Sequence, residues 1–237
     1  MQKYAIVTGC AKGIGREIAE ELARFGYNII GTYNKSINEM NSLKKKVDFI
    51  GVKFDMIKLD LLDDLSINSF LDYIKSKYKK IDILVNNAAL SLDNELNNKT
   101  VLEFMNVLKV NLLGPFNLIK ELRCLFNNSM IFNICSTDGI DTYSKYNIDY
   151  SASKAGLINL TKSLSLELTN AKIYAICPNW VDTESIREMN LDYLKEEMLR
   201  VGQSKLIDPK SIAFKIIDII YGNYESGTIF VIGEGYE

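Results

Sequence analysis

Histidine is absent from the 237-residue sequence, and this absence removes several kinds of chemistry. Ser-His-Asp and Cys-His nucleophilic catalysis both need an imidazole as base, and histidine-based zinc sites need it as a ligand. The four cysteines (10, 124, 135 and 177) stand far apart and form no C-x-x-C pair. We therefore expect no metal site, and the unpaired thiols indicate a reducing, cytoplasmic location.

Long apolar runs and a strong net charge are also missing. No run approaches the roughly 18 apolar residues that span a membrane, and an apolar strand that begins by Tyr4 leaves no room for a signal peptide. The formal net charge of −2 gives no reason to expect nucleic acid or an acidic membrane surface as a partner. The apolar share of 47% is ordinary for a globular protein.

Short apolar runs alternate with longer amphipathic stretches along the whole chain. The predicted strands lie at 4–7, 28–33, within 49–61, 81–85, 129–134, 172–177 and 228–232. The predicted helices lie at 14–25, 37–46, 64–78, 100–125 with a bend near Gly114-Pro115, from 150 onward, 191–201 and 209–221. Uniformly apolar strands separated by helices indicate a parallel sheet covered on both faces. We predict an α/β fold: a single doubly wound Rossmann-type domain, residues 1–237, with a mostly or wholly parallel sheet of about seven strands.

A glycine-rich turn, Thr8-Gly9-Cys10-Ala11-Lys12-Gly13-Ile14-Gly15, joins the first strand to the first helix. Its glycine spacing differs from G-x-G-x-x-G. Glycines still allow the backbone to approach a phosphate, and the helix N-terminus presents free N–H groups. The turn predicts a dinucleotide site with contacts from Gly9, Lys12, Gly13, Ile14 and Gly15, and a plain strand-to-helix turn is the alternative.

The end of the second strand carries no acidic residue. An NAD site would place one about 20 residues after the glycine turn, on the ribose 2′-hydroxyl. This chain has Tyr33-Asn34-Lys35-Ser36 there instead. Lys35, together with Lys12, can hold a 2′-phosphate, so the pattern favours NADP as cofactor, with NAD still possible and two merely solvated lysines as the alternative.

Tyr150 and Lys154 are four residues apart in a stretch with helical periodicity. On a helix they share a face, with Cβ atoms roughly 6 Å apart. An ammonium group beside a phenol favours the phenolate, so we expect Lys154 to lower the Tyr150 pKa from about 10. Such a pair exchanges a proton near neutral pH, although a surface pair that meets by helical spacing is the alternative.

Taken in order, these features resemble the short-chain dehydrogenase/reductase family over essentially the whole chain. Further matches are Asp60-Leu61 after the third strand, Asn86-Asn87-Ala88-Ala89 after the fourth, Asn111 in a helix, Ser136 after the fifth strand, and Pro178-Asn179-Trp180-Val181-Asp182-Thr183 after the sixth. Two of these motifs lack a glycine usual in the family, where Ala89 and Asn179 stand. Asn179 is expected to keep the turn through a positive φ, which asparagine tolerates.

The resemblance implies an oxidoreductase that transfers hydride between a nicotinamide and a carbonyl or alcohol carbon. It implies that Tyr150 exchanges the proton, Lys154 assists it, Ser136 hydrogen-bonds the substrate oxygen and Asn111 anchors a water. It adds cofactor contacts at Asp60, Leu61, Asn87, Ala88, Tyr150, Lys154, Pro178, Val181 and Thr183. A homotetramer or homodimer is implied as well, paired through the 100–125 and 150–170 helices.

The substrate is the least constrained part of the prediction. Residues 149–157 and the chain length are most similar to 3-oxoacyl-acyl-carrier-protein reductases, which suggests a 3-oxoacyl thioester. Those enzymes present cations to the carrier protein, but segments 126–129 and 167–170 carry none. A reductase of a free small ketone, sugar or quinone is the alternative, followed by a non-catalytic nicotinamide-binding sensor. Residues 183–201 would form the substrate loop, an apolar lid with Glu184, Glu188, Glu196 and Glu197 outside, or else an ordinary amphipathic helix.

Overall fold

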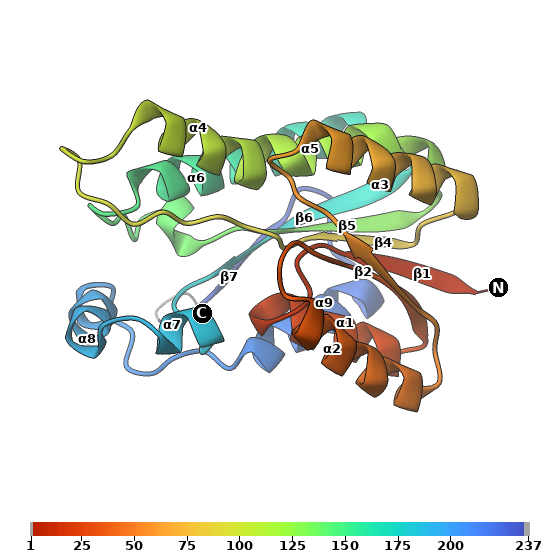
Figure 1. Cartoon of the computed structure of the whole chain (residues 1–237), viewed down its shortest axis with the longest axis horizontal. Helices are drawn as coiled ribbons and strands as arrows, with labels where there is room; N and C mark the ends of the chain where they lie inside the picture. Colours follow the sequence, from red (N-terminus) through yellow and green to blue (C-terminus); the bar gives the residue numbers. More distant parts are fainter. Residues whose placement is uncertain (1, 235–237) are drawn as a thin grey trace.

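One seven-stranded sheet forms the centre of the computed structural model, which describes residues 2–234 (Figure 1). The strand order is β3-β2-β1-β4-β5-β6-β7, and every neighbouring pair is parallel. The strands are β1 (Lys3–Val7), β2 (Tyr27–Tyr33), β3 (Phe54–Lys58), β4 (Ile83–Asn86), β5 (Ser129–Ile134), β6 (Ala171–Pro178) and β7 (Ile229–Ile232). The predicted α/β class with a wholly parallel seven-stranded sheet is confirmed.

Helices cover both faces of this sheet (Figure 1). One layer holds α1 (Gly13–Arg24), α2 (Ile37–Ile50) and α9 (Pro209–Tyr221), and the other holds α3 (Asp64–Lys77), α4 (Val101–Leu108), α5 (Gly114–Leu122) and α6 (Ile148–Glu167). Two short helices, α7 (Glu184–Arg187) and α8 (Leu191–Arg200), lie beside the sheet (Figure 1). Within residues 2–234, no helix combines the length and apolarity that a membrane span needs.

The two helical layers create two large cores, and a smaller third cluster lies between α6 and the sheet. In β1, Ala5 and Val7 pack into the core under α1, α2 and α9, whereas Ile6 packs into the core under α3 and α5. This follows from the alternation of side chains along a strand. Strands buried on both faces explain the uniformly apolar runs in the sequence.

Because β7 pairs with β6, both halves of the chain belong to one sheet. We infer from this that the chain is one domain. Its predicted ends, residue 1 and residues 235–237, lie outside the described residues.

Two helices differ from their predicted bounds. Helix α2 continues four residues past Lys46 and ends at Gly51, whose φ of 92° is favourable for glycine. The predicted 100–125 helix is divided by a π-helical turn, Lys109–Leu113, in which the Gly114 amide donates to the Lys109 carbonyl. The irregularity therefore precedes the expected Gly114-Pro115 bend, and it contains Asn111.

Candidate active site

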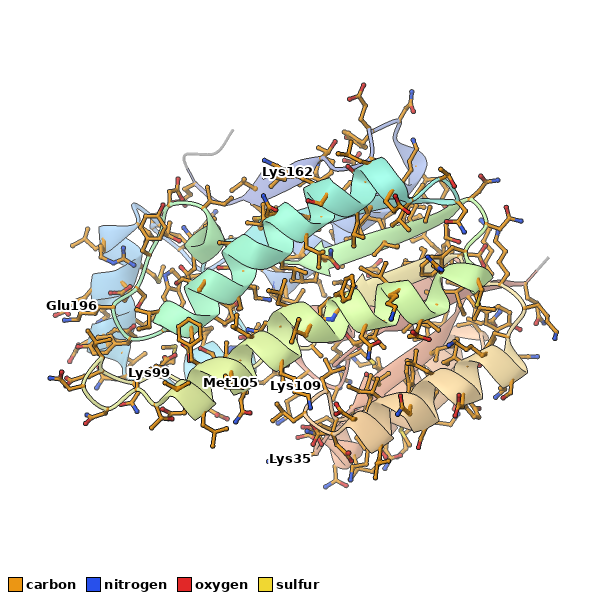
Figure 2. The ribbon with its side chains drawn as sticks, turned by 90° about the horizontal axis from the view of Figure 1, so that it is seen from above. Lys35, Lys99, Met105, Lys109, Lys162 and Glu196 are labelled. Carbon is orange, nitrogen blue, oxygen red and sulfur yellow. The ribbon has the colours of Figure 1, made fainter. Side chains whose placement is uncertain are left out.

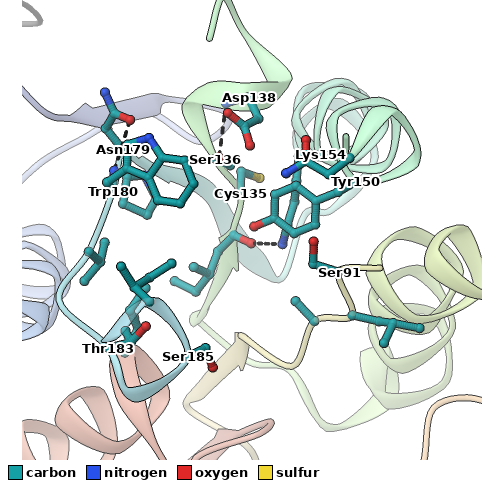
Figure 3. Close-up of a pocket in the computed structure, with 18 of the residues that line it drawn as sticks. Ser91, Cys135, Ser136, Asp138, Tyr150, Lys154, Asn179, Trp180, Thr183 and Ser185 are labelled. Carbon is teal, nitrogen blue, oxygen red and sulfur yellow. Dashed lines mark hydrogen bonds between the residues drawn. The ribbon is translucent and has the colours of Figure 1, made fainter. Parts of the chain in front are cut away.

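A cavity of about 570 Å³ opens at the carboxyl ends of the central strands (Figure 3). Its walls include Asn87 after β4, Ser136 after β5 and Pro178 at the end of β6. In doubly wound sheets, ligands bind beyond these strand ends, where the strand order reverses. Here the reversal lies between β1 and β4.

Tyr150 and Lys154 enter the cavity from the first turns of α6 (Figure 3). The Lys154 Nζ donates to the Ile134 carbonyl at 2.7 Å and lies 5.2 Å from the centre of the Tyr150 ring. The helix thus places both side chains on one face, as their spacing predicts. Lys154 is 2% exposed, so the backbone acceptor compensates for much of its lost hydration.

The pKa of Tyr150 is not lowered, contrary to expectation. Burial raises the pKa of the phenol above its ordinary value, and the charges of Asp138 and Cys135 add to this, while a hydrogen bond with Ser136 partly offsets them. Burial also lowers the pKa of Lys154. Desolvation disfavours the charged form of both groups, so the two side chains alone favour a neutral phenol.

Ser136 lies two residues after the end of β5 and caps a 3-10 turn, Thr137–Gly139. Its Oγ accepts a hydrogen bond from the Asp138 amide at 3.1 Å. The turn packs tightly on α6, because a Cβ on Gly139 would lie 2.6 Å from the Ala155 amide nitrogen. This close approach sets Ser136 against Tyr150.

Asn111 is buried behind the cavity and does not line it. Its Oδ1 accepts from the Leu90 amide at 2.8 Å, and its Nδ2 donates to the Leu90 carbonyl at 2.9 Å and to Ser153 Oγ at 3.0 Å. The side chain therefore ties the loop after β4 to α6. Both of its polar atoms are used in doing so.

The glycine turn is joined to the end of β4 by a dense set of hydrogen bonds. Thr8 Oγ1 accepts from the amides of Asn87 and Ala88 at 2.9 and 3.0 Å. The Asn87 Nδ2 donates to the carbonyls of Thr8 and Gly9 at 2.9 and 3.1 Å.

Two glycines of this turn are required by close packing. Gly9 has a φ of 63°, and a Cβ there would lie 2.9 Å from Ala88 Cα. A Cβ on Gly15 would lie 2.4 Å from Asn87 Nδ2. Ile14, between Gly13 and Gly15, lines the cavity.

The remaining predicted cofactor contacts lie outside the 570 Å³ cavity, at the same edge of the sheet. Lys35 follows β2 and is exposed, and Asp60 and Leu61 follow β3. The Asp60 Oδ1 accepts from the Leu62 amide at 2.9 Å, and Leu61 is buried. Lys12 is not a free cation, because its Nζ lies 2.9 Å from Glu39 Oε1.

The segment after β6 supplies one wall of the cavity through Pro178, Asn179, Trp180, Val181 and Thr183. The expected positive φ at Asn179 is wrong: among the described residues, Asn128 is the one non-glycine residue with a positive φ. Gln203 holds the segment instead, accepting from the Trp180 amide at 3.0 Å and donating to its carbonyl at 2.7 Å. Asparagine therefore fits without left-handed backbone.

The predicted substrate loop contributes Ile186 and Met189 to the cavity. Glu184 Oε2 accepts from the Gly13 amide at 3.1 Å, which joins α7 to the glycine turn. Glu197 was expected outside but is buried, 2.6 Å from Arg200. The ion pair makes its burial tolerable.

Sequence reasoning missed several polar residues of the cavity wall, among them Asp138 and Asn147. Asp138 lies two residues after Ser136, and Asn147 lies three residues before Tyr150. Their closeness to predicted catalytic residues was the available signal.

Known proteins resemble this chain over nearly its full length. The family model "short chain dehydrogenase" matches residues 3–194. The 3-oxoacyl-[acyl-carrier-protein] reductase of Aquifex aeolicus (strain VF5) is 30% identical over 240 residues, which cover 98% of this chain and 96% of that protein. The enzyme of the same name from Staphylococcus aureus (strain Mu50 / ATCC 700699) is 32% identical over 248 residues, covering 100% and 99%.

Solved structures agree with the fold. A dehydrogenase/reductase from Sinorhizobium meliloti 1021 has a TM-score of 0.89 at 27% identity, covering 97% of this chain and 93% of that one. A short chain dehydrogenase from Burkholderia cenocepacia J2315, solved in complex with NADP, has a TM-score of 0.88 at 24% identity, covering 99% and 97%. With the family model and the full-length relatives, these findings show that the chain belongs to the short-chain dehydrogenase/reductase family, oxidoreductases that act on CH–OH and C=O groups.

Proposed function

We propose that this protein is an NADP(H)-dependent reductase of a carbonyl compound, working through Tyr150, Ser136 and Lys154. The observation that carries the proposal is that these three side chains line one cavity next to the glycine-rich turn. The reverse oxidation of an alcohol uses the same groups.

The chain's own residues fit a dinucleotide. The N-terminus of α1 and the glycine turn suit a pyrophosphate, with Gly9, Gly13, Ile14 and Gly15 nearest to it. Lys35 suits a 2′-phosphate, and Asp60 and Leu61 suit the adenosine. The buried Nδ2 of Asn179, which has no hydrogen-bond partner and belongs to a residue of the cavity wall, is a donor free for the nicotinamide end.

Relatives support NADP in particular. The Burkholderia cenocepacia neighbour was solved with NADP, and a blue fluorescent protein from a metagenomic library (TM-score 0.88, 24% identity) was solved with NADPH. The contacts at Asn87, Ala88, Pro178, Val181 and Thr183 complete the proposed cofactor site.

In the proposed mechanism, a bound nicotinamide supplies the hydride. Tyr150 gives its proton to the carbonyl oxygen, and a raised pKa keeps that proton in place at neutral pH. Ser136 Oγ donates a hydrogen bond to the same oxygen and stabilises its growing negative charge. Lys154 orients the site and binds the nicotinamide ribose. Asn111 supports a proton relay through its main chain, since its side-chain atoms are already engaged.

Two substrate classes have separate support. The two full-length relatives are 3-oxoacyl-[acyl-carrier-protein] reductases by name, which favours a 3-oxoacyl thioester on a carrier protein. The absence of lysine and arginine in segments 126–129 and 167–170 favours a free small ketone, sugar or quinone, because a carrier protein is acidic and needs cations to dock.

The test is Tyr150→Phe against a panel of ketones and an acyl-carrier thioester, measured as NADPH consumption. The variant is expected to lose about 10²- to 10⁴-fold in kcat, the usual contribution of general acid catalysis, while NADPH binding stays within about threefold. Equal turnover by wild type and variant would overturn the mechanism. Tight NADPH binding by a wild type that reduces nothing would favour the sensor alternative.

We also propose a homotetramer or homodimer paired through α4, α5 and α6, which run side by side on one face (Figure 2). Large apolar side chains are exposed there, among them Leu102 at 66%, Met105 at 60% and Leu166 at 90%. Such a face is typical of an interface between copies. Light scattering on wild type and Met105→Glu gives the subunit number and tests the face. The cytoplasmic location stays a prediction.

A further inference from the structure

We infer that Asp138 and Asn147 select, within the proposed reductase site, a small carbonyl substrate that carries a hydrogen-bond donor, a hydroxyl or an ammonium group, beside its carbonyl. The inference rests on the proposed function, because it concerns the same cavity. The group concerned is the substituent beside the carbonyl that is reduced.

The first observation is that two carboxylates, Asp93 and Asp138, line the cavity. The Asp138 carboxylate lines it, held by a hydrogen bond from Thr142 Oγ1 to its Oδ1 at 2.9 Å. Asp93 lines it as well, accepting from Ser91 Oγ at 2.9 Å. Ionised carboxylates only accept hydrogen bonds, so these two groups favour a ligand that carries a hydrogen-bond donor.

The second observation is an unpaired buried acceptor. Asn147 is 8% exposed and lines the cavity, and its Oδ1 has no hydrogen-bond partner. Buried polar atoms are nearly always paired, and an exception calls for an explanation. The Oδ1 atom itself has almost no accessible surface, so a rotation of the amide is needed to bring it to the cavity, where a donor on the substrate would pair with it. Asn147 lies three residues before Tyr150, at the start of α6.

The charges around the cavity argue in the same direction. The one cation among its described lining residues is Lys154, whose Nζ is already bonded to the Ile134 carbonyl. Arg200 is the cation whose charge lowers the pKa of Asp138. Its guanidinium is paired with Glu197 at 2.6 Å and donates to the Thr142 carbonyl. A substrate with a carboxylate or phosphate beside its carbonyl would meet two carboxylates and no free cation, which is unfavourable.

Trp180, Ile186 and Met189 supply the apolar part of the cavity wall. They suit the carbon skeleton of the substrate, while Asp138 and Asn147 orient it. Asp138 is thus a specificity-determining residue, and Tyr150 and Ser136 remain the groups that act on the carbonyl oxygen.

The experiment compares four matched methyl ketones that differ in one substituent: 2-butanone (ethyl), hydroxyacetone (hydroxymethyl), aminoacetone (ammonium) and pyruvate (carboxylate). Wild type is expected to show a kcat/KM at least tenfold higher for hydroxyacetone or aminoacetone than for 2-butanone, and lowest for pyruvate. Hydrogen bonds to a charged partner lead to differences of roughly 10- to 100-fold.

Two variants assign the effect to its residues. Asp138→Asn keeps an acceptor but removes the charge, so it should lower the ratio of kcat/KM for aminoacetone to kcat/KM for 2-butanone by about tenfold or more. The ratio is the readout because the Asp138 charge also acts on Tyr150, which serves every ketone. Asn147→Leu should lower kcat/KM for both donor-bearing ketones, hydroxyacetone and aminoacetone. Asp192→Asn, an equal charge change on α8 outside the cavity, is the control and should change none of them.

A binding readout separates this inference from the proposed function. Trp180 is the only tryptophan and lines the cavity, so its fluorescence reports occupancy without turnover. With NADP⁺ present, 1-amino-2-propanol or 1,2-propanediol should bind wild type more tightly than 2-butanol, and Asp138→Asn should weaken the amino alcohol.

Each outcome has one reading. Turnover of all four ketones without discrimination, or equal losses for all four in Asp138→Asn, overturns the inference and leaves the proposed function standing. If wild type reduces none of the ketones and no acyl-carrier thioester but binds the donor-bearing alcohols selectively through Asp138, the proposed function fails and the donor selection stands. Preference for pyruvate overturns the inference.

Discussion

Lys99 Nζ lies 3.0 Å from Asp149 Oδ2, and the two side chains are 3% and 0% exposed. Lys99 also donates to the Leu92 carbonyl, and Asp149 Oδ1 accepts from the Tyr150 amide at 3.0 Å. This buried ion pair therefore fastens the loop after β4 to the residue that precedes Tyr150. The loop and α6 meet through these two residues.

Lys99→Met should destabilise the protein by about 3–5 kcal/mol, because it leaves the Asp149 charge buried without its partner. Urea unfolding measures the change. Lys44→Met is the matched control, because Lys44 and its partner Asp48 are 43% and 50% exposed. Its expected loss of stability is about 0–1 kcal/mol. The double variant Lys99→Met, Asp149→Leu should regain much of the loss. A single variant as stable as wild type would show that the pair contributes little.

Sequence alone predicted the sheet, the helices, the glycine turn and the Tyr150–Lys154 pair because each depends on local pattern, whereas Ser136 and Asn111 became candidates only through the resemblance to a family. Uniform apolar runs mark strands buried on both faces, and Tyr150 and Lys154 share a face through helical spacing alone. Asp138 and Asn147 are different: they matter because a turn and a helix start meet around one cavity. No local pattern encodes that meeting.

The raised pKa of Tyr150 is a second property that sequence could not give. Spacing brings Lys154 near, but burial of the phenol decides the direction of the shift. The ion pair of Lys12 is another property that sequence could not give. Lys12 lies in the glycine turn, whereas its partner Glu39 lies in α2.

Lys35→Ala should raise the Kd for NADPH by about tenfold and leave the Kd for NADH unchanged, because Lys35 is the exposed cation proposed for the 2′-phosphate. Isothermal titration measures both. Lys45→Ala, an exposed lysine of α2, is the control and should change neither. Equal losses for both cofactors would place Lys35 away from the 2′-phosphate.

Glu39→Gln should lower the Kd for NADPH by a fewfold. The carboxylate now holds Lys12 at 2.9 Å, and its hydrogen bond raises the pKa of that lysine. The neutral amide would release the ammonium toward the cofactor's phosphate and remove a repelling charge. No change in affinity would show that Lys12 does not reach the phosphate.

Asp138→Asn should make the protein more stable at pH 7–8, because burial raises the pKa of this carboxyl above its ordinary 3.8. A folded-state pKa above the unfolded one favours the folded state at acid pH and costs stability once the pH exceeds the folded-state value. The groups around it are Thr142, whose hydrogen bond lowers the pKa, Arg200, which also lowers it, and Glu197 and Asp93, which raise it.

The gain in Tm from Asp138→Asn should therefore shrink as the pH falls toward 4. Thermal unfolding of both proteins from pH 4 to 8 measures it. A gain that does not vary with pH would trace to packing instead of charge. A stability cost at a substrate-binding residue is the usual trade between function and stability.

Gly139→Ala should lower both stability and kcat. A Cβ there would lie 2.6 Å from the Ala155 nitrogen and 2.6 Å from the Lys154 carbonyl carbon, both backbone atoms that cannot move aside. The turn must shift away from α6, at a cost of about 1–3 kcal/mol, and Ser136 at its start moves with it relative to Tyr150.

Gly51→Ala is the control for that loss of activity. Gly51 has a φ of 92°, and a Cβ added there would have no neighbouring atom within 4 Å, so alanine strains the backbone at the end of α2 without steric contact. Both variants should melt earlier than wild type, and Gly139→Ala alone should lose roughly tenfold or more in kcat, because small misplacements of reacting groups are costly. Equal kcat in Gly139→Ala and wild type, with the stability loss present, would mean that α6 and the turn can separate without disturbing the proposed pair of Ser136 and Tyr150.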